Sequence, residues 1–225
     1  GVYKTFNNRL PVPRIITKIA LITAPNSDGQ RDFQQELKQN KHGYTFSVSE
    51  YLTTIQGDTA SKLIIEQLQQ IENDKGNFDV VAIVRGGGSL TDFKPFDDYE
   101  LAKYVAGFPI PIFTGIGHDR NQSIVDLMAR EQKTPTKVAS TFVEQNFTFE
   151  NNLIELKRNL FELVQEQLES AKENLDNAKR IVKLSSPQTI LNRGFAIITI
   201  GNKIIVDPKT ITEKAELQTL LRDET

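Results

Sequence analysis

Three short, largely apolar runs, each followed within two residues by a proline or a glycine, constrain the fold of this 225-residue chain most strongly. The runs cover residues 19–23, 80–84 and 110–116. Short and continuously apolar runs are typical of strands that are buried on both faces of a sheet. Residues 46–52 carry a weaker strand pattern. The sequence therefore predicts a sheet built from these four strands.

Helical patterns alternate with the predicted strands. Ser27 and Gln30 have the spacing of a capping box, Asp58 precedes an apolar helical face, and Thr134 precedes a proline at the first helical position. The predicted helices cover residues 27–39, 58–71, 97–106, 123–130 and 135–145. Alternating strands and helices predict a mostly parallel sheet with helices on both faces, whose ligands bind at the carboxyl ends of the strands.

Residues 150–183 carry a different pattern, with interspersed acidic and basic residues and neither glycine nor proline. Apolar residues recur in it with a mean step of about 3.6 residues, the period of a straight α-helix. These residues are Leu153, Leu156, Leu160, Val164, Leu168, Ala171, Leu175, Ala178 and Val182. The pattern predicts a long helix that must bury its apolar stripe on a partner or on a domain.

These patterns divide the chain into four expected segments. Residues 1–16, which end in a proline-rich stretch, are expected to be a linker. Residues 17–146 are expected to form an α/β domain, residues 147–184 a long helix, and residues 185–225 a β extension with a hairpin across Gly201. The predicted fold class is α/β, with a mostly parallel sheet flanked by helices, followed by a long helix and a small C-terminal β-hairpin extension.

The composition excludes several classes of site. The chain contains no cysteine, which rules out disulfides, a thiolate zinc site and a cysteine nucleophile. Its two histidines argue against a metal centre with several histidine ligands, so we expect no metal site. No apolar run reaches the roughly 18 residues of a membrane span, so we expect a cytoplasmic protein without membrane contact. The net charge of -2 gives no general sign of nucleic-acid binding, although residues 1–24 hold four basic residues and no acidic one.

The strongest local motif is Arg85-Gly86-Gly87-Gly88-Ser89, which directly follows the second apolar run. Three glycines allow the backbone amides to turn toward an anion, and no Cβ atom blocks its approach. The adjoining arginine adds a planar charged group that matches phosphate oxygens. The motif is neither a P-loop nor a dinucleotide-binding fingerprint. It favours an anion site over a merely flexible turn.

Three further residues are candidates for proton transfer near the same sheet edge. His118 follows the third apolar run, and histidine is the side chain best suited to move protons near neutral pH. Asp32 lies in the first turns of the first predicted helix, where it either complements the helix dipole or faces Arg85 and His118. Asp126, in the helix that follows His118, either complements that helix's dipole or faces the same sheet edge, and we include it among the candidate catalytic residues.

In their order and spacing, these motifs resemble the large subunit of bacterial exonuclease VII over about residues 14–200. The Arg-Gly-Gly-Gly-Ser motif at residue 85, followed at this distance by Gly117-His118, is the most specific part of the resemblance. The other matching motifs are Leu21-Ile22-Thr23, Arg31-Asp32, Gln56-Gly57-Asp58, Leu90-Thr91-Asp92, Phe96-Asp97-Asp98, Asp126, Pro135-Thr136 and Leu191-Asn192-Arg193-Gly194-Phe195-Ala196.

The resemblance implies an exodeoxyribonuclease that degrades single-stranded DNA from both ends to oligonucleotides with 5′-phosphates. It also implies a cytoplasmic complex with several copies of a small helical subunit, and no strict need for a divalent metal, which at most modulates activity. The essential residues of the family correspond to Asp32, Arg85 and His118. Arg85 and the amides of Gly86, Gly87, Gly88 and Ser89 are then expected to hold the scissile phosphate. His118 is expected to act as general base or acid, and Asp32 to orient water or the imidazole.

The chain also departs from the family pattern. Asn121 stands where the family has an aspartate three residues after the histidine, and Asp119 replaces a glutamate. We expect residues 1–16 to correspond to the exit linker of the family's N-terminal OB-fold, and the predicted helix over residues 150–183 is shorter than the family's helical arm. Two alternatives therefore stay open: a catalytically weakened scaffold subunit, and a non-hydrolytic α/β module that binds a phosphate or nucleotide.

Overall fold

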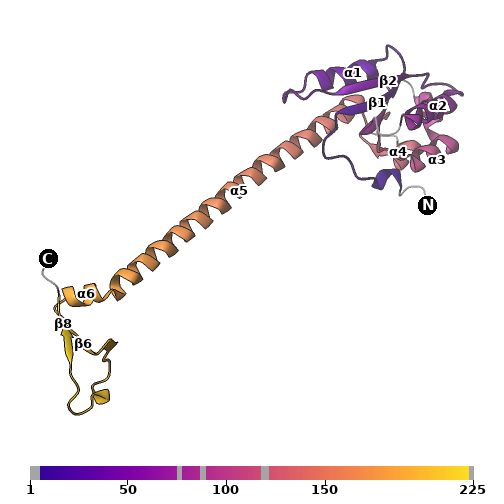
Figure 1. Cartoon of the computed structure of the whole chain (residues 1–225). Helices are drawn as coiled ribbons and strands as arrows, with labels where there is room; N and C mark the ends of the chain where they lie inside the picture. The colour runs from indigo at the N-terminus through magenta and orange to yellow at the C-terminus, as the bar shows by residue number, and fades with distance from the viewer. Residues whose placement is uncertain (1–5, 75–77, 87–89, 118–121, 223–225) are drawn as a thin grey trace. The chain divides into compact units, whose positions relative to one another are not determined.

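The computed structural model of the chain describes residues 6–74, 78–86, 90–117 and 122–222. The chain divides into two compact units, residues 1–155 and residues 156–225. Figure 1 shows a helix-flanked sheet in the first unit and a small sheet in the second. The expectations for Gly87, Gly88, Ser89, His118 and Asn121 fall outside the described residues.

The first unit contains a five-stranded sheet in the order β2-β1-β3-β4-β5, in which every neighbouring pair is parallel. The strands are β1 (Lys18–Thr23), β2 (Ser47–Leu52), β3 (Val80–Val84), β4 (Ile112–Gly115) and β5 (Arg130–Glu131). The parallel sheet and its first four strands are confirmed. In β1, β3 and β4 nearly every residue is buried, because helices cover both faces of the sheet.

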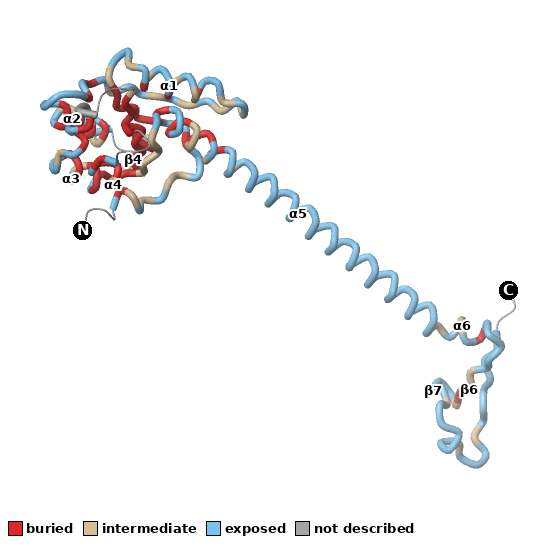
Figure 2. Tube along the Cα trace, turned by 180° about the vertical axis from the view of Figure 1, so that it is seen from behind, coloured by how far each residue is buried: buried red, intermediate tan, exposed pale blue. Residues whose placement is uncertain are grey.

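Helices cover the two faces of this sheet unequally. The described helices of the first unit are α1 (Asp28–Lys38), α2 (Ala60–Asn73), α3 (Tyr99–Gly107), α4 (Ile124–Met128), the start of α5 (Pro135–Ser185), and the 3-10 helices η2 (Asn7–Arg9) and η3 (Leu90–Asp97). Side chains of α2, η3, α3 and α4 form one core cluster with Ile22 and Ile83. Side chains of α1 and α5 form the other cluster with Leu21 and Ala82, which point to the opposite face. Figure 2 shows these buried residues gathered in the first unit.

The predicted helix starts are confirmed at two places and wrong at one. Ser27 accepts a hydrogen bond from the Gln30 amide at 3.2 Å, and Thr134 accepts one from the Lys137 amide at 3.2 Å. The Gln30 side chain accepts a hydrogen bond from the amide of Asn26, whereas a capping box would have it accept from the amide of Ser27. Asp58 does not cap a helix: α2 begins at Ala60, after a turn in which the Ala60 amide donates to the Gly57 carbonyl.

The helix predicted over residues 123–130 ends early. Ser123 caps α4, which ends at Met128, and residues 130–131 then pair with β4 as an edge strand. The Gln132 amide also donates to the Thr114 carbonyl at 2.8 Å. A strand of two residues has no periodicity of its own, so its pairing partner alone determines it.

The two helices predicted over 135–145 and 150–183 are one helix, α5, of 51 residues. The buried residue Asn146 lies between the two predicted segments. Its side chain accepts from the Ile16 amide at 2.7 Å and donates to the Ile16 carbonyl at 2.8 Å. Because a neighbouring chain segment satisfies this polar side chain, it does not interrupt the helix.

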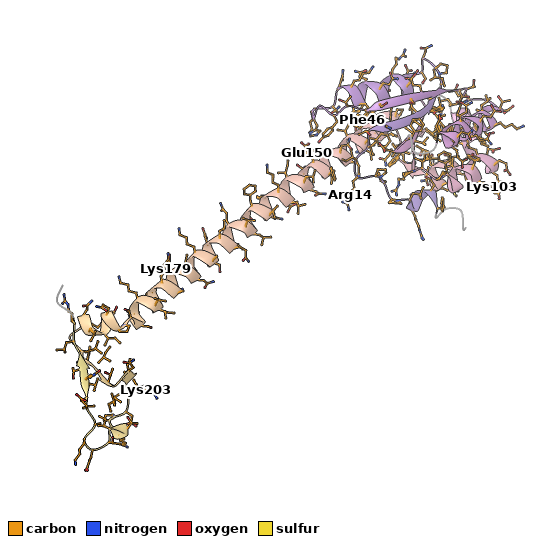
Figure 3. The ribbon with its side chains drawn as sticks, in the orientation of Figure 1. Arg14, Phe46, Lys103, Glu150, Lys179 and Lys203 are labelled. Atoms are coloured by element: carbon orange, nitrogen blue, oxygen red, sulfur yellow. The ribbon has the colours of Figure 1, made fainter. Side chains whose placement is uncertain are left out.

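Side chains stand away from α5 along its later turns, as Lys179 does in Figure 3. The seven larger members of the predicted apolar stripe are 49–71% exposed in the described chain. They are Leu153, Leu156, Leu160, Val164, Leu168, Leu175 and Val182. The stripe thus has the predicted helical spacing and is open to a partner.

The second unit ends in a three-stranded antiparallel sheet in the order β7-β6-β8. After α6 (Pro187–Asn192), the elements are β6 (Ile197–Ile200), β7 (Lys203–Ile204), η4 (Pro208–Thr210) and β8 (Gln218–Leu220). The predicted hairpin is confirmed, with Gly201 at a φ of 57° in its turn. The third strand, β8, was not predicted, because three exposed residues give no clear alternation.

Residues 6–16, predicted to be a linker, lie against the α/β domain. The buried Asn7 side chain donates to the carbonyls of Phe108 (2.9 Å) and Ile110 (2.8 Å) and accepts from the Ile112 amide (3.0 Å). Further along, Arg130 donates to the Leu10 carbonyl at 2.6 Å. Side-chain hydrogen bonds therefore fasten this segment beside β4.

The first turn of α1 touches the end of β3 backbone to backbone. A Cβ atom at Gly29 would lie 2.6 Å from the carbonyl carbon of Arg85, and a Cβ atom at Gly86 would lie 2.7 Å from the backbone nitrogen of Gly29. Both distances are shorter than real Cβ contacts, so glycine at both positions permits the approach. This contact places the start of α1 beside Arg85 and Gly86, the first two residues of the glycine motif.

Replacing Asn7 by alanine should destabilise the first unit by about 3 kcal/mol, because two carbonyls and one amide lose their partner in a buried place. Asn8→Ala is the matched control, since the structure gives the half-buried Asn8 side chain no such set of bonds, and its effect should stay within about 0.5 kcal/mol. Urea unfolding followed by circular dichroism measures both. Equal effects would show that Asn7 does not fasten the segment.

Gly86→Ala should destabilise the same unit by about 1–3 kcal/mol, because the new methyl group meets the backbone of α1. Gly107→Ala is the control: its Cβ atom would meet no other atom within 4 Å. That variant should be neutral or slightly stabilising. The comparison uses thermal unfolding, and a Gly86→Ala chain as stable as Gly107→Ala would contradict the close approach.

Candidate active site

The carboxyl edge of the sheet is hollowed where β1, β2 and β3 end. A cavity of about 450 Å³ opens there, at the predicted ligand edge. It is lined by Ala24, Pro25, Asn26, Ser27, Asp28, Arg31, Thr54, Ile55, Gln56, Arg85 and Gly86. The lining thus comes from the loop between β1 and α1, the first turn of α1, the segment after β2 and the end of β3.

Arg85 is the buried cation of this cavity, with 3% of its surface exposed. Its guanidinium carbon lies 4.6 Å from the centroid of the Phe93 ring, an arrangement in which the ring face attracts the cation. Its backbone amide donates to the Gly115 carbonyl of β4 at 3.1 Å. The backbone and the ring together hold the guanidinium in place at the cavity wall.

The loop between β1 and α1 forms another part of the cavity wall. Asn26 has a φ of 56°, in the left-handed region that asparagine tolerates better than most residues. The hydroxyl groups of Thr23 and Ser27 lie 3.3 Å apart and share a hydrogen bond. The loop therefore leads directly into the amino end of α1, whose helix dipole is positive on this side of the cavity.

Asp32 is exposed on α1 and does not line the cavity. It lies one helical turn after Asp28, which does line it, so the two side chains share a face of the helix. The structure thus places Asp32 beside the cavity that contains Arg85 and one turn outside its wall. Its predicted catalytic role stays a prediction.

Asp126 is buried, with 2% of its surface exposed, and its carboxylate is fully engaged. It accepts from the Thr114 hydroxyl at 2.6 Å, the Ser123 amide at 3.0 Å and the Ser123 hydroxyl at 2.8 Å. It lines a separate cavity of about 380 Å³, away from Arg85. These contacts tie the start of α4 to β4, which is a structural role, and a part in catalysis stays a prediction.

His118 and the last three residues of the glycine motif lie outside the described residues. Their described neighbours are Gly117, which follows β4, and Gly86, which follows β3. Because β3 and β4 pair in parallel, these two neighbours leave the sheet at the same edge. This topology is consistent with the prediction that Arg85 and His118 lie near each other, which stays a prediction.

Sequence reasoning missed the polar residues that complete the cavity. These are Asn26, Ser27, Asp28, Arg31, Thr54 and Gln56. Thr54 and Gln56 follow β2, so their position after a parallel strand was a usable signal. Arg31 gave a weaker one, because an arginine on an exposed helix face usually has no role in a site.

Shifted pKa values occur outside the Arg85 cavity, at Tyr44, Tyr51, Tyr104 and Arg130. A hydrogen bond to Glu150, with some burial, raises the pKa of Tyr44 to about 12. Burial and a hydrogen bond to Glu72 raise the pKa of Tyr104 to about 12. Burial, helped by Asp74, raises the pKa of Tyr51, and burial lowers the pKa of Arg130.

Among the described residues, histidine, aspartate and glutamate side chains nowhere gather in a group of three or more that suits a metal ion. Within the same residues, no helix combines the length and apolar character needed to cross a membrane.

Comparison with known proteins identifies the family. The family model described as "Exonuclease VII, large subunit" matches residues 5–184. The exodeoxyribonuclease 7 large subunit of Anaplasma marginale is 34% identical over 130 residues, which are 58% of this chain and 32% of the relative. The corresponding protein of a Nostoc species is 36% identical over 126 residues, 56% of this chain and 30% of the relative.

A third relative extends the match. The large subunit of Limosilactobacillus reuteri is 31% identical over 147 residues, 65% of this chain and 32% of the relative. The chain thus spans about a third of the length of the curated relatives that it matches. Since the family model covers most of the chain, including every described element of the Arg85 cavity, the chain belongs to the exonuclease VII large subunit family.

Proposed function

We propose that this chain is the catalytic part of an exodeoxyribonuclease that hydrolyses single-stranded DNA from both ends to oligonucleotides with 5′-phosphates. Membership of the family supports this proposal. The observation that carries it is the buried guanidinium of Arg85, held on Phe93 at the wall of a cavity at the carboxyl edge of the sheet. A buried, fixed cation at that edge is suited to a phosphate ligand.

Hydrolysis of a phosphodiester requires in-line attack by water and stabilisation of charge on the phosphoryl oxygens. Arg85 supplies a rigid, permanently charged donor for those oxygens. In this proposal the amides of Gly86, Gly87, Gly88 and Ser89 add hydrogen-bond donors for the same oxygens.

Proton transfer is assigned to His118, acting as general base or acid. Asp32 orients the attacking water or the imidazole, and Asp126 supports the site by holding the start of α4. Asn121 offers an amide where the family has a carboxylate, so it can orient a neighbour by hydrogen bonding without adding negative charge.

We propose further that no divalent metal is strictly required and that a metal at most modulates activity. The charged groups that line the cavity in the described residues are two guanidinium groups and one carboxylate, from Arg31, Arg85 and Asp28. That set is suited to an anion. Arg85 and the backbone amides of the glycine motif would supply the charge stabilisation that a metal ion supplies in other nucleases.

The partner proposed for α5 is the small subunit of exonuclease VII, in several copies, within a cytoplasmic complex. The exposed stripe described above supports this assignment, since a helix with such a stripe gains stability by burying it against another helix. Single-stranded DNA is the proposed substrate and a membrane is not a proposed partner.

Two alternatives to the nuclease are each supported by one observation. Asn121 in place of the family's aspartate favours a catalytically weakened scaffold that organises small subunits. The cavity with Arg85 would equally serve a module that binds a phosphate or nucleotide without cleaving it.

The test is degradation of an end-labelled single-stranded oligonucleotide by the chain with its small subunit, with and without chelator. Cleavage that survives chelation and falls at least about 100-fold in His118→Ala and in Arg85→Gln is expected, as for the loss of a proton-transfer or charge-stabilising group. Arg14→Gln, an exposed arginine outside the cavity, is the control and should cleave normally. Absence of cleavage by the unmodified complex would move the assignment to the scaffold or the binding module.

The partner proposal is tested with four substitutions to glutamine, a good helix former. Leu160→Gln with Leu168→Gln alters the stripe, whereas Glu162→Gln with Glu169→Gln alters the opposite face of α5. Losing two buried leucine contacts should weaken binding of the small subunit by at least about 100-fold. The glutamate pair should leave binding unchanged. Analytical ultracentrifugation of the mixed subunits measures both, and equal weakening would contradict a specific role for the stripe.

A further inference from the structure

Two arginines from different elements line the cavity at the carboxyl edge. Arg85 follows the end of β3 and is buried on Phe93, whereas Arg31 belongs to the first turn of α1 and its side chain is 67% exposed. The proposed function uses only Arg85. Arg31 therefore has a position in the site and no assigned role.

The contact that the structure gives the Arg31 side chain is an ion pair with Asp28, three residues earlier on α1. Both side chains are largely exposed, at 67% and 70%. Exposed pairs of this kind contribute about 0–1 kcal/mol, because water screens them and both side chains lose freedom. The pair therefore keeps Arg31 at the rim and yields readily to a stronger anionic partner.

The rest of the lining suits a phosphate strand. Asn26, Ser27 and Thr54 line the same cavity, and amide and hydroxyl groups of this kind commonly bind phosphate and sugar oxygens. The charged lining side chains sum to one positive charge, from Arg31, Arg85 and Asp28. The volume of about 450 Å³ lies in the range of cavities that hold a nucleotide-sized ligand.

We infer that Arg31 binds a second phosphate of a single-stranded nucleic acid, adjacent along the strand to the phosphate that Arg85 holds. This inference rests on the proposed function. Arg31 releases Asp28 when the strand binds, and its guanidinium then serves the phosphate. Arg31 is a substrate-binding residue that sets affinity for the strand, and Asp28 is its ion-pair partner when no strand is bound.

The experiment measures binding of a fluorescein-labelled oligothymidylate to the full chain over a series of salt concentrations. His118→Ala serves as the background, so that cleavage does not interfere. Each phosphate contact on a single strand contributes about 0.7 to the slope of log Kd against log salt. Arg31→Gln should lower that slope by about 0.7 and raise Kd about 10-fold or more, as for loss of one charged hydrogen-bonding group.

Three further variants make the result specific. Arg31→Lys keeps the charge and should restore the slope but only part of the affinity, because lysine lacks the planar fork. Asp28→Asn removes the competing carboxylate and should tighten binding. Arg14→Gln removes an exposed arginine outside the cavity and should change neither quantity. Circular dichroism checks that all of the variants remain folded.

An Arg31→Gln slope equal to the background slope, while Arg85→Gln lowers it, would overturn the inference and leave the proposed nuclease intact. Thymidine 5′-monophosphate provides the second arm, because it carries a single phosphate. If Arg31→Gln weakened the mononucleotide as much as the oligonucleotide, both arginines would share one phosphate, which also contradicts the inference. A lowered slope in a chain that never cleaves DNA would support the inference and count against the proposed hydrolysis instead.

Discussion

The backbone contact between the first turn of α1 and the end of β3 is the constraint on which the candidate site depends. Gly29 and Gly86 approach so closely that neither position has room for a Cβ atom. The approach places the β1–α1 loop, the rim residue Arg31 and the buried Arg85 around one cavity. The parallel pairing of β1 with β3 brings these segments to the same edge, and the contact then sets the distance between them.

Much of the first unit follows from local pattern. The strands β1 and β3 are visible in the sequence as continuous apolar runs, because both of their faces are covered. Ser27 marks the start of α1, because its own side chain caps the helix. The features that the local pattern does not predict depend on contacts between residues that are distant in the sequence. Asn146 continues α5 because it bonds to Ile16, and β5 exists because it pairs with β4.

The candidate site was predictable to a similar degree. Arg85 follows from a strand that runs into glycines, and the structure places it at a cavity wall. Asp126 had an equally suggestive position, yet its carboxylate is taken up by Thr114 and Ser123, which a linear pattern cannot reveal. Asn26 and Arg31 join the cavity through the close approach of α1 to β3, so the local pattern around them does not show that they line it.

The central claim is that single-stranded DNA binds at the carboxyl edge of the sheet, around Arg85. Hydrogen–deuterium exchange of the full His118→Ala chain, with and without oligothymidylate, tests it most directly. The account predicts slower exchange of the amides of residues 26–31 and of Gly86 in the complex, with residues 40–46 at the opposite edge unchanged. Binding that leaves residues 26–31 and Gly86 unprotected would contradict it.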